Sequence, residues 1–384
     1  MKILPLLVGE IFVPLKPSNL QCMHLKRLSL LNFKNIAQAD LTPGEGINCF
    51  TGDNGAGKTN IMDAVYILSM SKSAAGMTDG QCVRHGENFY VVEGEYVSSD
   101  ERHECVVCSF MRGSGKTLKR NGKNYDRLSD HVGLIPIVIV VPSDTMLISD
   151  AADERRRYLN SFISQFDRPY LEALMRYNSV LAERNRFLKM SSDEAMLQVY
   201  DAQLATHGEV IHARRAEIVE RLQPVVAEYY DALSPEGETI DIRYRSELND
   251  APFAEILERA RQKDIVNEFT TSGIHRDDIL FTIGGMPLRR FGSQGQQKSF
   301  LIALKLAQYS LISELRGERP ILLLDDVCDK LDEHRVERLV RLVSGEKFGQ
   351  IFITDCNEQR LRSLLDRAGC EYCHFGVKEG DVNC

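Results

Sequence analysis

The run Gly52-Asp53-Asn54-Gly55-Ala56-Gly57-Lys58-Thr59 constrains what this chain can fold into more than any other stretch. It matches the phosphate-binding pattern in which two glycines, with four residues between them, are followed by Lys and then Ser or Thr. An apolar segment precedes the run at 47–50 and a helix-like segment follows it at 61–68, so the order is strand, loop, helix. Glycines let backbone N–H groups curve around phosphate oxygens, and the helix N-terminus adds partial positive charge. We therefore predict that residues 52–59 bind a nucleoside triphosphate.

A second half of this site is expected at Asp325-Asp326, which directly follows the apolar run at 321–324. Two acids at the carboxyl end of a buried strand lie where open α/β sheets bind ligands. We predict that Asp325 and the Thr59 hydroxyl hold Mg²⁺. The predicted catalytic residues are Lys58, which reaches the β and γ phosphates, and Asp326, which orients or deprotonates the attacking water.

A third element, Phe291-Gly292-Ser293-Gln294-Gly295-Gln296-Gln297-Lys298, resembles the Ser-Gly-Gly-Gln signature of ATP-binding-cassette ATPases. The resemblance implies that ATP is the nucleotide and that Ser293, Gly295 and Gln296 contribute to binding it. In that superfamily the signature contacts the γ-phosphate held by the partner subunit, so ATP joins two copies. The segment 329–332, Asp-Lys-Leu-Asp, resembles the superfamily's D-loop, which lies across the dimer interface.

Two departures from the cassette pattern affect the predicted chemistry. Cassette ATPases typically have Glu where this chain has Asp326, and His after the next strand where it has Thr354-Asp355. A shorter carboxylate and the lack of a switch imidazole position water less well. We therefore expect slow hydrolysis, with ATP acting mainly as a timer for dimerisation.

The pattern along the chain predicts an α/β fold, a cassette-type ATPase head that is split by an inserted helical domain. We assign residues 1–22 to an N-terminal extension, 23–147 and 239–384 to the head, and 148–238 to the helical domain. Short strands are expected up to 141 and again from 240 to 283, and a helix from 299 to 313. Within the helical segment, five aliphatic residues recur every seven positions, which is typical of a helix packed along a seam of about 45 Å. They are Leu197, Leu204, Ile211, Ile218 and Val225.

Composition excludes some classes of protein. The 384 residues carry a formal charge of −8, which argues against a histone-like polycation but leaves room for a local basic patch. No apolar run approaches the ~18 residues of a membrane span, and the first ten residues resemble a signal peptide only faintly. The ten cysteines are scattered, as in a reducing compartment, so we expect a cytoplasmic protein. The pairs Cys105/Cys108 and Cys370/Cys373 have zinc-ligand spacing, but buried thiols are the favoured interpretation.

Beyond the ATPase motifs, the chain resembles the RecF family of bacterial DNA replication and repair proteins from about Met23 to its C-terminus. The family usually has Pro where this chain has Ile274. The Asp pair at 325 and 326 is normal for RecF. The more specific stretches that carry the resemblance are 30–35 (Leu-Leu-Asn-Phe-Lys-Asn), 141–144 (Val-Pro-Ser-Asp), 154–159 (Glu-Arg-Arg-Arg-Tyr-Leu), 181–185 (Leu-Ala-Glu-Arg-Asn), 273–278 (Gly-Ile-His-Arg-Asp-Asp) and 291–297.

The resemblance implies an ATP-dependent homodimer that binds gapped DNA, works with RecO and RecR to load the RecA recombinase, and supports the SOS response. The residues themselves support DNA binding modestly, through arginine clusters on the helical segment. Solvated helix faces, on which these arginines pair with neighbouring Glu, are the alternative. No base-reading motif is visible, so DNA binding, to single strands or gapped duplex, is expected to be independent of sequence. The clusters are Arg155-Arg156-Arg157, Arg184 with Arg186, and Arg214-Arg215.

Two other functions fit part of the pattern. The ATPase subunit of a membrane transporter shares the nucleotide motifs, but the long heptad-spaced insert argues against a short subdomain that receives a coupling helix. An ATPase-coupled nuclease of the overcoming-lysogenisation type requires an additional acidic, metal-binding domain. Only about thirty residues follow the ATPase core, which leaves little room for one.

Overall fold

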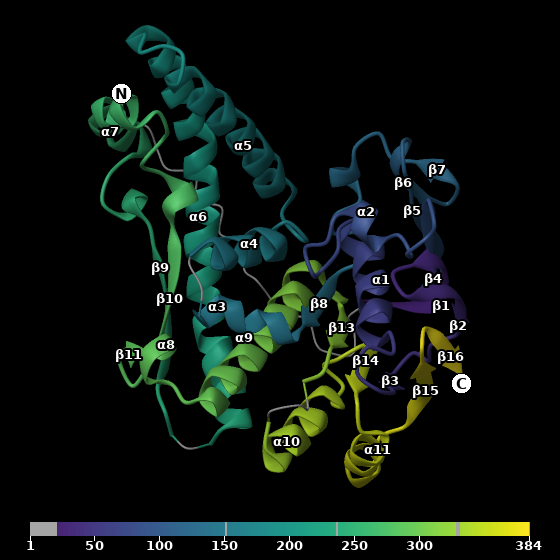
Figure 1. The fold of residues 1–384 in the computed structure, drawn as a ribbon. Helices are drawn as coiled ribbons and strands as arrows, with labels where there is room; N and C mark the ends of the chain where they lie inside the picture. Colours follow the sequence, from purple (N-terminus) through teal and green to yellow (C-terminus); the bar gives the residue numbers. More distant parts are fainter. Residues whose placement is uncertain (1–20, 150–151, 236, 328–330, 384) are drawn as a thin grey trace.

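The computed structural model describes residues 21–149, 152–235, 237–327 and 331–383. The predicted extension 1–22 lies outside these residues except for Gln21 and Cys22, which begin the first strand instead of preceding the domain. Figure 1 shows two lobes, one built around two sheets and one built around long helices. In the described part of the chain, no helix has both the length and the apolar character needed to cross a bilayer.

A six-stranded sheet carries the predicted nucleotide motifs. Five of its strands are parallel, and β16 pairs antiparallel with β15 at one edge. Strand β8 lies directly beside β13, although 180 residues separate them, because a long insertion leaves the sheet after β8 and returns before β13. The head is therefore split, as predicted. In spatial order the strands are β16 (Asp381–Asn383), β15 (Tyr372–Lys378), β3 (Ile47–Thr51), β14 (Ile351–Asp355), β13 (Ile321–Leu324) and β8 (Ile137–Val140).

A seven-stranded, mostly antiparallel sheet forms the other part of the head. Its strands are β12 (Glu318–Arg319), β1 (Gln21–Phe33), β4 (Phe89–Ser98), β5 (His103–Met111), β6 (Gly115–Arg120) and β7 (Lys123–Asn124) in order, with β2 (Ile36–Leu41) paired to β1. Helix α1 (Lys58–Met70) packs between this sheet and the parallel sheet, and the short α2 (Asp79–Cys82) follows it. Ile61, Ala64 and Leu68 of α1 are fully buried in this layer.

Alternate residues of the parallel strands enter two different cores. Ile137 and Leu323 pack toward α1 and the antiparallel sheet, whereas Val138 and Leu324 pack toward the helices of the second lobe. Because both faces are covered, these strands read as continuous apolar runs rather than alternating ones. The expectation of a buried strand at 321–324 is thereby confirmed.

The second lobe is built on two long helices whose starts are capped by side chains. Asp167 caps α5 and accepts from the Tyr170 N–H, and Asp193 caps α6 in the same way. Helix α6 has 40 residues, which exceeds the length expected from the sequence. The two long helices are α5 (Arg168–Leu188) and α6 (Glu194–Leu233). The other helices of the lobe and the head, after α1 and α2, are α3 (Met146–Ser149), α4 (Ala152–Ile163), α7 (Phe253–Asn267), α8 (Leu288–Phe291), α9 (Gln294–Arg316), α10 (Glu333–Val343) and α11 (Glu358–Arg367).

The heptad seam predicted on α6 is largely confirmed. The first four of its five positions, from Leu197 to Ile218, are fully buried. Beyond Pro224, which lies inside the helix, the stripe moves by one residue, so that Val226 is buried and Val225 is only half-buried.

Residues 240–283 differ from the expectation of short strands alone. Strands β9 (Ile240–Arg245), β10 (Asp278–Ile283) and β11 (Met286–Pro287) form a third sheet, but α7 lies between β9 and β10. The buried positions, Phe253, Leu257, Ala260 and Asp264, have helical spacing, so the sequence carries a signal for this helix that the prediction overlooked. The third sheet lies beside α6, away from the head sheets (Figure 1). We therefore propose that the helical domain extends past 238 to about α8.

Candidate nucleotide-binding site

The phosphate loop has the predicted context of strand, loop and helix. Strand β3 ends at Thr51, and α1 begins at Lys58 behind Gly57, whose φ of 124° lies in the region that favours glycine. The first N–H groups of a helix have no partner within it, so the start of α1 offers donors to an anion. The Lys58 ammonium is buried and donates to the carbonyl oxygens of Gly52 (2.6 Å) and Asp53 (2.9 Å).

Neighbouring segments leave no room for a side chain at Gly52 and little room at Gly57. A Cβ at Gly52 would overlap the Val377 carbonyl oxygen, and one at Gly57 would lie 3.0 Å from the Asn35 amide oxygen. Asn35 also donates to the Ala56 carbonyl at 3.1 Å and accepts from Asn60 at 2.7 Å. Asn35, from the β1–β2 turn, therefore holds the loop from outside. Sequence reasoning placed it in a family motif but gave it no role.

The acidic pair lies opposite the start of α1. Asp325 follows β13 and is 2% exposed. Its Oδ1 accepts from the hydroxyls of Thr59 (3.1 Å) and Thr354 (2.8 Å). Burial raises the pKa of the Asp325 carboxyl above its ordinary value, against these two hydrogen bonds. Thr354 was noted in the sequence only for standing where cassette ATPases place His.

The residues present here fit a magnesium ion. Asp325 Oδ2 is buried and has no hydrogen-bond partner within residues 21–149, 152–235, 237–327 and 331–383. An unsatisfied carboxylate oxygen in the interior is costly unless a ligand compensates it. Magnesium prefers one or two protein oxygens together with phosphate oxygens, and Asp325 with Thr59 supplies such a set. The two predicted metal ligands are thus brought together.

Asp326 has an unusual backbone conformation next to this pair. Its φ is 51°, in the left-handed region, and its N–H donates to the Thr354 hydroxyl at 2.8 Å. Thr354 therefore bridges both acids, since it donates to Asp325 and accepts from Asp326. Left-handed geometry at a residue other than glycine is uncommon and persists where the surroundings enforce it.

A cavity of about 170 Å³ joins the phosphate loop to the acidic pair. Lys58, Thr59, Asp325 and Asp326 line it together, as predicted. Its full lining is Asn54, Gly55, Gly57, Lys58, Thr59, Asn60, Pro142, Asp325, Asp326 and Thr354. Sequence reasoning missed Asn60, Pro142 and Thr354, which come from three separate segments.

The signature segment lies at the start of α9 and not in this cavity. Ser293 caps α9 and accepts from the Gln296 N–H at 3.2 Å, while the Gln296 side chain accepts from the Ser293 N–H at 2.6 Å. Gln296 also donates to Glu238, and a Cβ at Gly295 would overlap the Arg335 guanidinium. No residue of 293–296 is among those that line the cavity beside the phosphate loop.

Two other parts of the predicted dimer region are Lys298 and the predicted D-loop at 329–332. Lys298, one turn into α9, lines a smaller cavity of about 110 Å³ together with Asp325 and Asp326, a contact that the sequence did not indicate. Of the predicted D-loop, Asp329 and Lys330 lie outside the described residues. Asp332 caps α10 and accepts from the Arg335 N–H at 3.0 Å.

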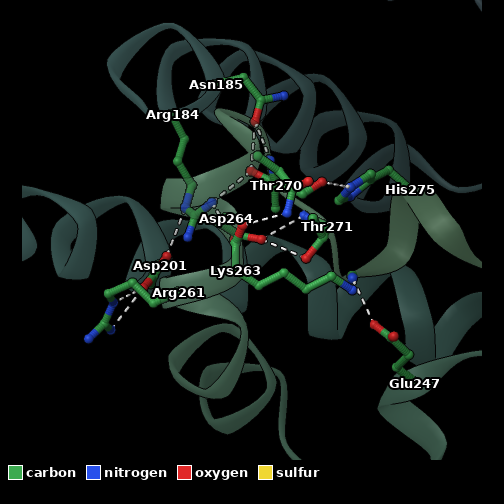
Figure 2. A network of polar contacts seen from close by, with 12 residues as sticks. Arg184, Asn185, Asp201, Glu247, Arg261, Lys263, Asp264, Thr270, Thr271 and His275 are labelled. Atoms are coloured by element: carbon green, nitrogen blue, oxygen red, sulfur yellow. Dashed lines mark hydrogen bonds and ion pairs between the residues drawn. The ribbon is translucent and has the colours of Figure 1, made fainter. Parts of the chain in front are cut away.

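The arginine clusters, which the sequence left open as phosphate contacts or solvated ion-paired helix faces, are largely structural. Arg184 and Arg215 are 0% and 1% exposed, so neither contacts a phosphate at the surface. Arg184 lies between Asp201 and Asp264, at 2.9 and 2.8 Å (Figure 2). Arg155 pairs with the buried Asp278. Because their charge is compensated in the interior, neither a phosphate contact nor a solvated helix face describes these positions.

The remaining arginines of these clusters reach the surface to different degrees. Arg156 has a largely buried side chain, whereas Arg157 is 73% exposed but pairs with Glu154 at 2.7 Å. Arg214 is 40% exposed and pairs with Asp167 and Glu217. Arg186 is exposed and forms no ion pair with another described residue.

The cysteines of the two Cys-x-x-Cys pairs lie in different environments. Cys108 is buried, as expected, but Cys105 is half-buried and Cys373 is exposed. The expectation of buried thiols is therefore wrong for Cys373. Burial raises the pKa of the Cys108 thiol.

Comparisons with known proteins agree with this geometry. The family model described as an AAA domain matches residues 27–218. The DNA replication and repair protein RecF of Bacteroides thetaiotaomicron is 43% identical over 363 residues, which span 94% of this chain and 98% of that protein.

Solved structures give the same relationship. A structure of the recombination mediator protein RecF with ATP, in the RecFOR pathway, is 30% identical and covers 94% of this chain and 97% of its own, with a TM-score of 0.84. An Smc head domain from Pyrococcus furiosus, with an extended coiled coil, has a TM-score of 0.57 at 16% identity, covering 94% of this chain and 95% of its own. The second likeness concerns the fold alone.

Proposed function

This chain belongs to the RecF family of DNA replication and repair proteins, and from that premise we propose that it is an ATP-dependent DNA-binding protein of replication and recombinational repair. The observation that carries the nucleotide half of this proposal is the meeting of the phosphate loop with Asp325. Lys58, Thr59 and Asp325 line one cavity, although Thr59 and Asp325 are 266 positions apart in the sequence. Such convergence is what a magnesium-bound triphosphate requires.

The nucleotide is held by groups whose roles differ. Bound Mg²⁺ supplies positive charge that neutralises the phosphate oxygens. The Lys58 ammonium exchanges its contacts with the Gly52 and Asp53 carbonyls for phosphate oxygens, and Asp326 orients water. Because no imidazole stands at Thr354, hydrolysis is slow, below the ~10 s⁻¹ of a typical enzyme. ATP therefore acts mainly as a switch.

That switch is a homodimer in which each copy completes the other's site. Its support is the position of Ser293, which caps a 23-residue helix and lies outside the cavity of its own phosphate loop. A helix start that exposes N–H groups is a ready anion site. Ser293, Gly295 and Gln296 are thus proposed to bind the γ-phosphate that the partner subunit holds.

The biological partners follow from the family. We propose that the ATP-bound dimer acts at gapped DNA in the cytoplasm, with RecO- and RecR-type mediators, to load the recombinase and support the SOS response. Contacts to the DNA backbone, and not to bases, are expected, so affinity is independent of sequence and falls with salt.

Light scattering with and without Mg-ATP, paired with an ATP-binding assay, tests the nucleotide switch. Lys58→Ala is expected to lose ATP affinity and dimerisation together. Ser293→Arg is expected to bind ATP as a monomer, whereas Ser192→Arg, in the exposed connection between α5 and α6, dimerises normally. Normal dimerisation of Ser293→Arg would contradict the shared site.

A further inference from the structure

One short segment of the head is strongly basic in an acidic chain. Residues 112–127 contain six Lys or Arg and one acid, Asp126, whereas the whole chain has a formal charge of −8. The segment forms β6, a turn and β7, at the edge of the seven-stranded sheet (Figure 1). Its basic residues are Arg112, Lys116, Lys119, Arg120, Lys123 and Arg127.

The segment ends in a tight hairpin, in which β6 also pairs with β5 and β7 is two residues long. Asn121 and Gly122 both have positive φ, 49° and 79°, as the two central residues of a type I′ hairpin turn require. Arg120 lies opposite Lys123 across the ribbon. Since neighbouring residues of a strand point to opposite faces, Lys119 projects from one face and Lys123 from the other.

Ion pairing divides these cations into two groups. Lys116 pairs with Asp79 at 2.7 Å, and Arg120 pairs with Glu104. Lys119, Lys123 and Arg127 are exposed and form no ion pair or side-chain hydrogen bond within the described ranges of the chain. Two cations without an ion pair therefore lie on the hairpin itself, and a third, Arg127, follows it three residues after β7.

We propose that the β6–β7 hairpin contacts the phosphates of double-stranded DNA through Lys119, Lys123 and Arg127. The major groove of B-form DNA is about 12 Å wide and admits a two-stranded ribbon. Lys119 and Lys123 lie on opposite faces of the hairpin end, so the two cations can contact phosphates on both sides of such a groove. Such contacts carry no sequence information. This inference rests on the DNA binding proposed above and assigns it to the head and not to the arginine clusters of the second lobe.

The test compares two triple variants of the full-length protein. The first, Lys119→Ala/Lys123→Ala/Arg127→Ala, removes the unpaired cations of the hairpin. The second, Arg176→Ala/Arg186→Ala/Lys189→Ala, removes three exposed cations of the α5 helix and its C-cap that also form no ion pair with described residues. Both carry the same change of charge. Binding to a labelled gapped duplex is measured with Mg-ATP from 50 to 200 mM salt, and circular dichroism with ATP binding confirms that each variant is folded.

The expected result is specific to the hairpin. Loss of three phosphate contacts reduces the slope of log Kd against log salt by about 2–3, and weakens binding on the order of 10–100-fold at 0.1 M salt. The α5 variant keeps the wild-type slope and affinity.

The other outcomes each point to a different error. If the hairpin variant keeps the wild-type salt dependence of DNA binding, this inference is overturned, while DNA binding by the wild-type protein still upholds the proposed function. If only the α5 variant loses DNA affinity, the contact lies on the second lobe. A wild-type protein that binds no DNA overturns the proposed function itself. If the hairpin mutations abolish binding only to phosphatidylglycerol vesicles, the hairpin serves a lipid surface instead.

Discussion

Replacing Arg184 by Met should lower the free energy of unfolding of the second lobe strongly, because this arginine is a structural cation. Its guanidinium contacts Asp201 Oδ1 at 2.9 Å, Asp264 Oδ2 at 2.8 Å and the Thr270 hydroxyl at 2.8 Å (Figure 2). Arg184 and Asp264 are both 0% exposed. Methionine fills much of the same volume but leaves the carboxylates without this cation.

The cost of the substitution is concentrated at Asp264. Asp201 keeps a second cation, since Arg261 donates to its Oδ2 at 2.9 Å. Asp264 keeps only neutral donors, the N–H and hydroxyl of Thr271, among its contacts in the described part of the chain. Removing one partner of a buried ion pair costs about 3–5 kcal/mol, because a charge stays in the interior without compensation. We expect a loss of this size in the free energy of unfolding.

Urea unfolding followed by circular dichroism measures the effect. With a slope of about 3 kcal/mol per molar urea, the loss lowers the midpoint by roughly 1–2 M. Arg186→Met is the matched control, since Arg186 lies two residues away, is exposed and forms no ion pair with a described residue. It should change stability by no more than about 0.5 kcal/mol. Equal midpoints for the two variants would refute the structural role of Arg184.

A double-mutant cycle isolates the pair itself. Asp264→Asn removes the charge that Arg184→Met leaves behind but keeps an oxygen for the Thr271 donors. The double variant should therefore lose about 1–3 kcal/mol less than the sum of the two single variants. Additive losses would show that packing of the arginine stem, and not the ion pair, stabilises this core.

Two further predictions concern groups whose pKa values are shifted. Asp325→Asn should remove the Mg²⁺-dependent part of the thermal stabilisation by ATP. It should not lower the melting temperature of the nucleotide-free protein, because burial raises the pKa of this carboxyl and its charge therefore does not stabilise the fold. Burial lowers the pKa of His275 from 6.5 to about 4, while its Nε2–H donates to the Thr270 carbonyl and its Nδ1 accepts from the Tyr177 hydroxyl. As pH falls from 6.5 to 4 the unfolded chain binds a proton that the folded chain does not, so the free energy of unfolding should decrease by on the order of 2–3 kcal/mol. His275→Gln should flatten this pH dependence in urea titrations, and an unchanged slope would contradict it.

The sequence predicted the parts of the site that depend on local pattern. The phosphate loop is contiguous, so its glycines, Lys58 and Thr59 are recognisable without a structure. Asp325 was found because four apolar residues in a row indicate a strand that is buried on both faces. Ligands bind at the carboxyl end of such strands. Both steps need only neighbours along the chain.

Residues that act across segments were beyond this kind of reasoning. Thr354 is the next-to-last residue of β14, which lies between β3 and β13, and that strand order is not readable from spacing. Asn35 holds the phosphate loop from a turn 20 residues upstream. The burial of Asp264 on α7 likewise depends on Arg184 in another helix, although the helical spacing of Phe253, Leu257 and Ala260 was readable.

The arginines show most clearly what charge patterns omit. A run such as Arg155-Arg156-Arg157 looks like a phosphate-binding cluster, yet Arg155 pairs with Asp278, which lies 123 residues away. Such pairing is invisible in the sequence, since acids of every segment are candidates. The segment 112–127 has one acid among seven charged residues, and although acids of other segments pair with Lys116 and Arg120, Lys119, Lys123 and Arg127 form no ion pair with a described residue. An excess of one charge over a short span therefore identifies an uncompensated surface better than a cluster of arginines in a segment rich in Glu and Asp.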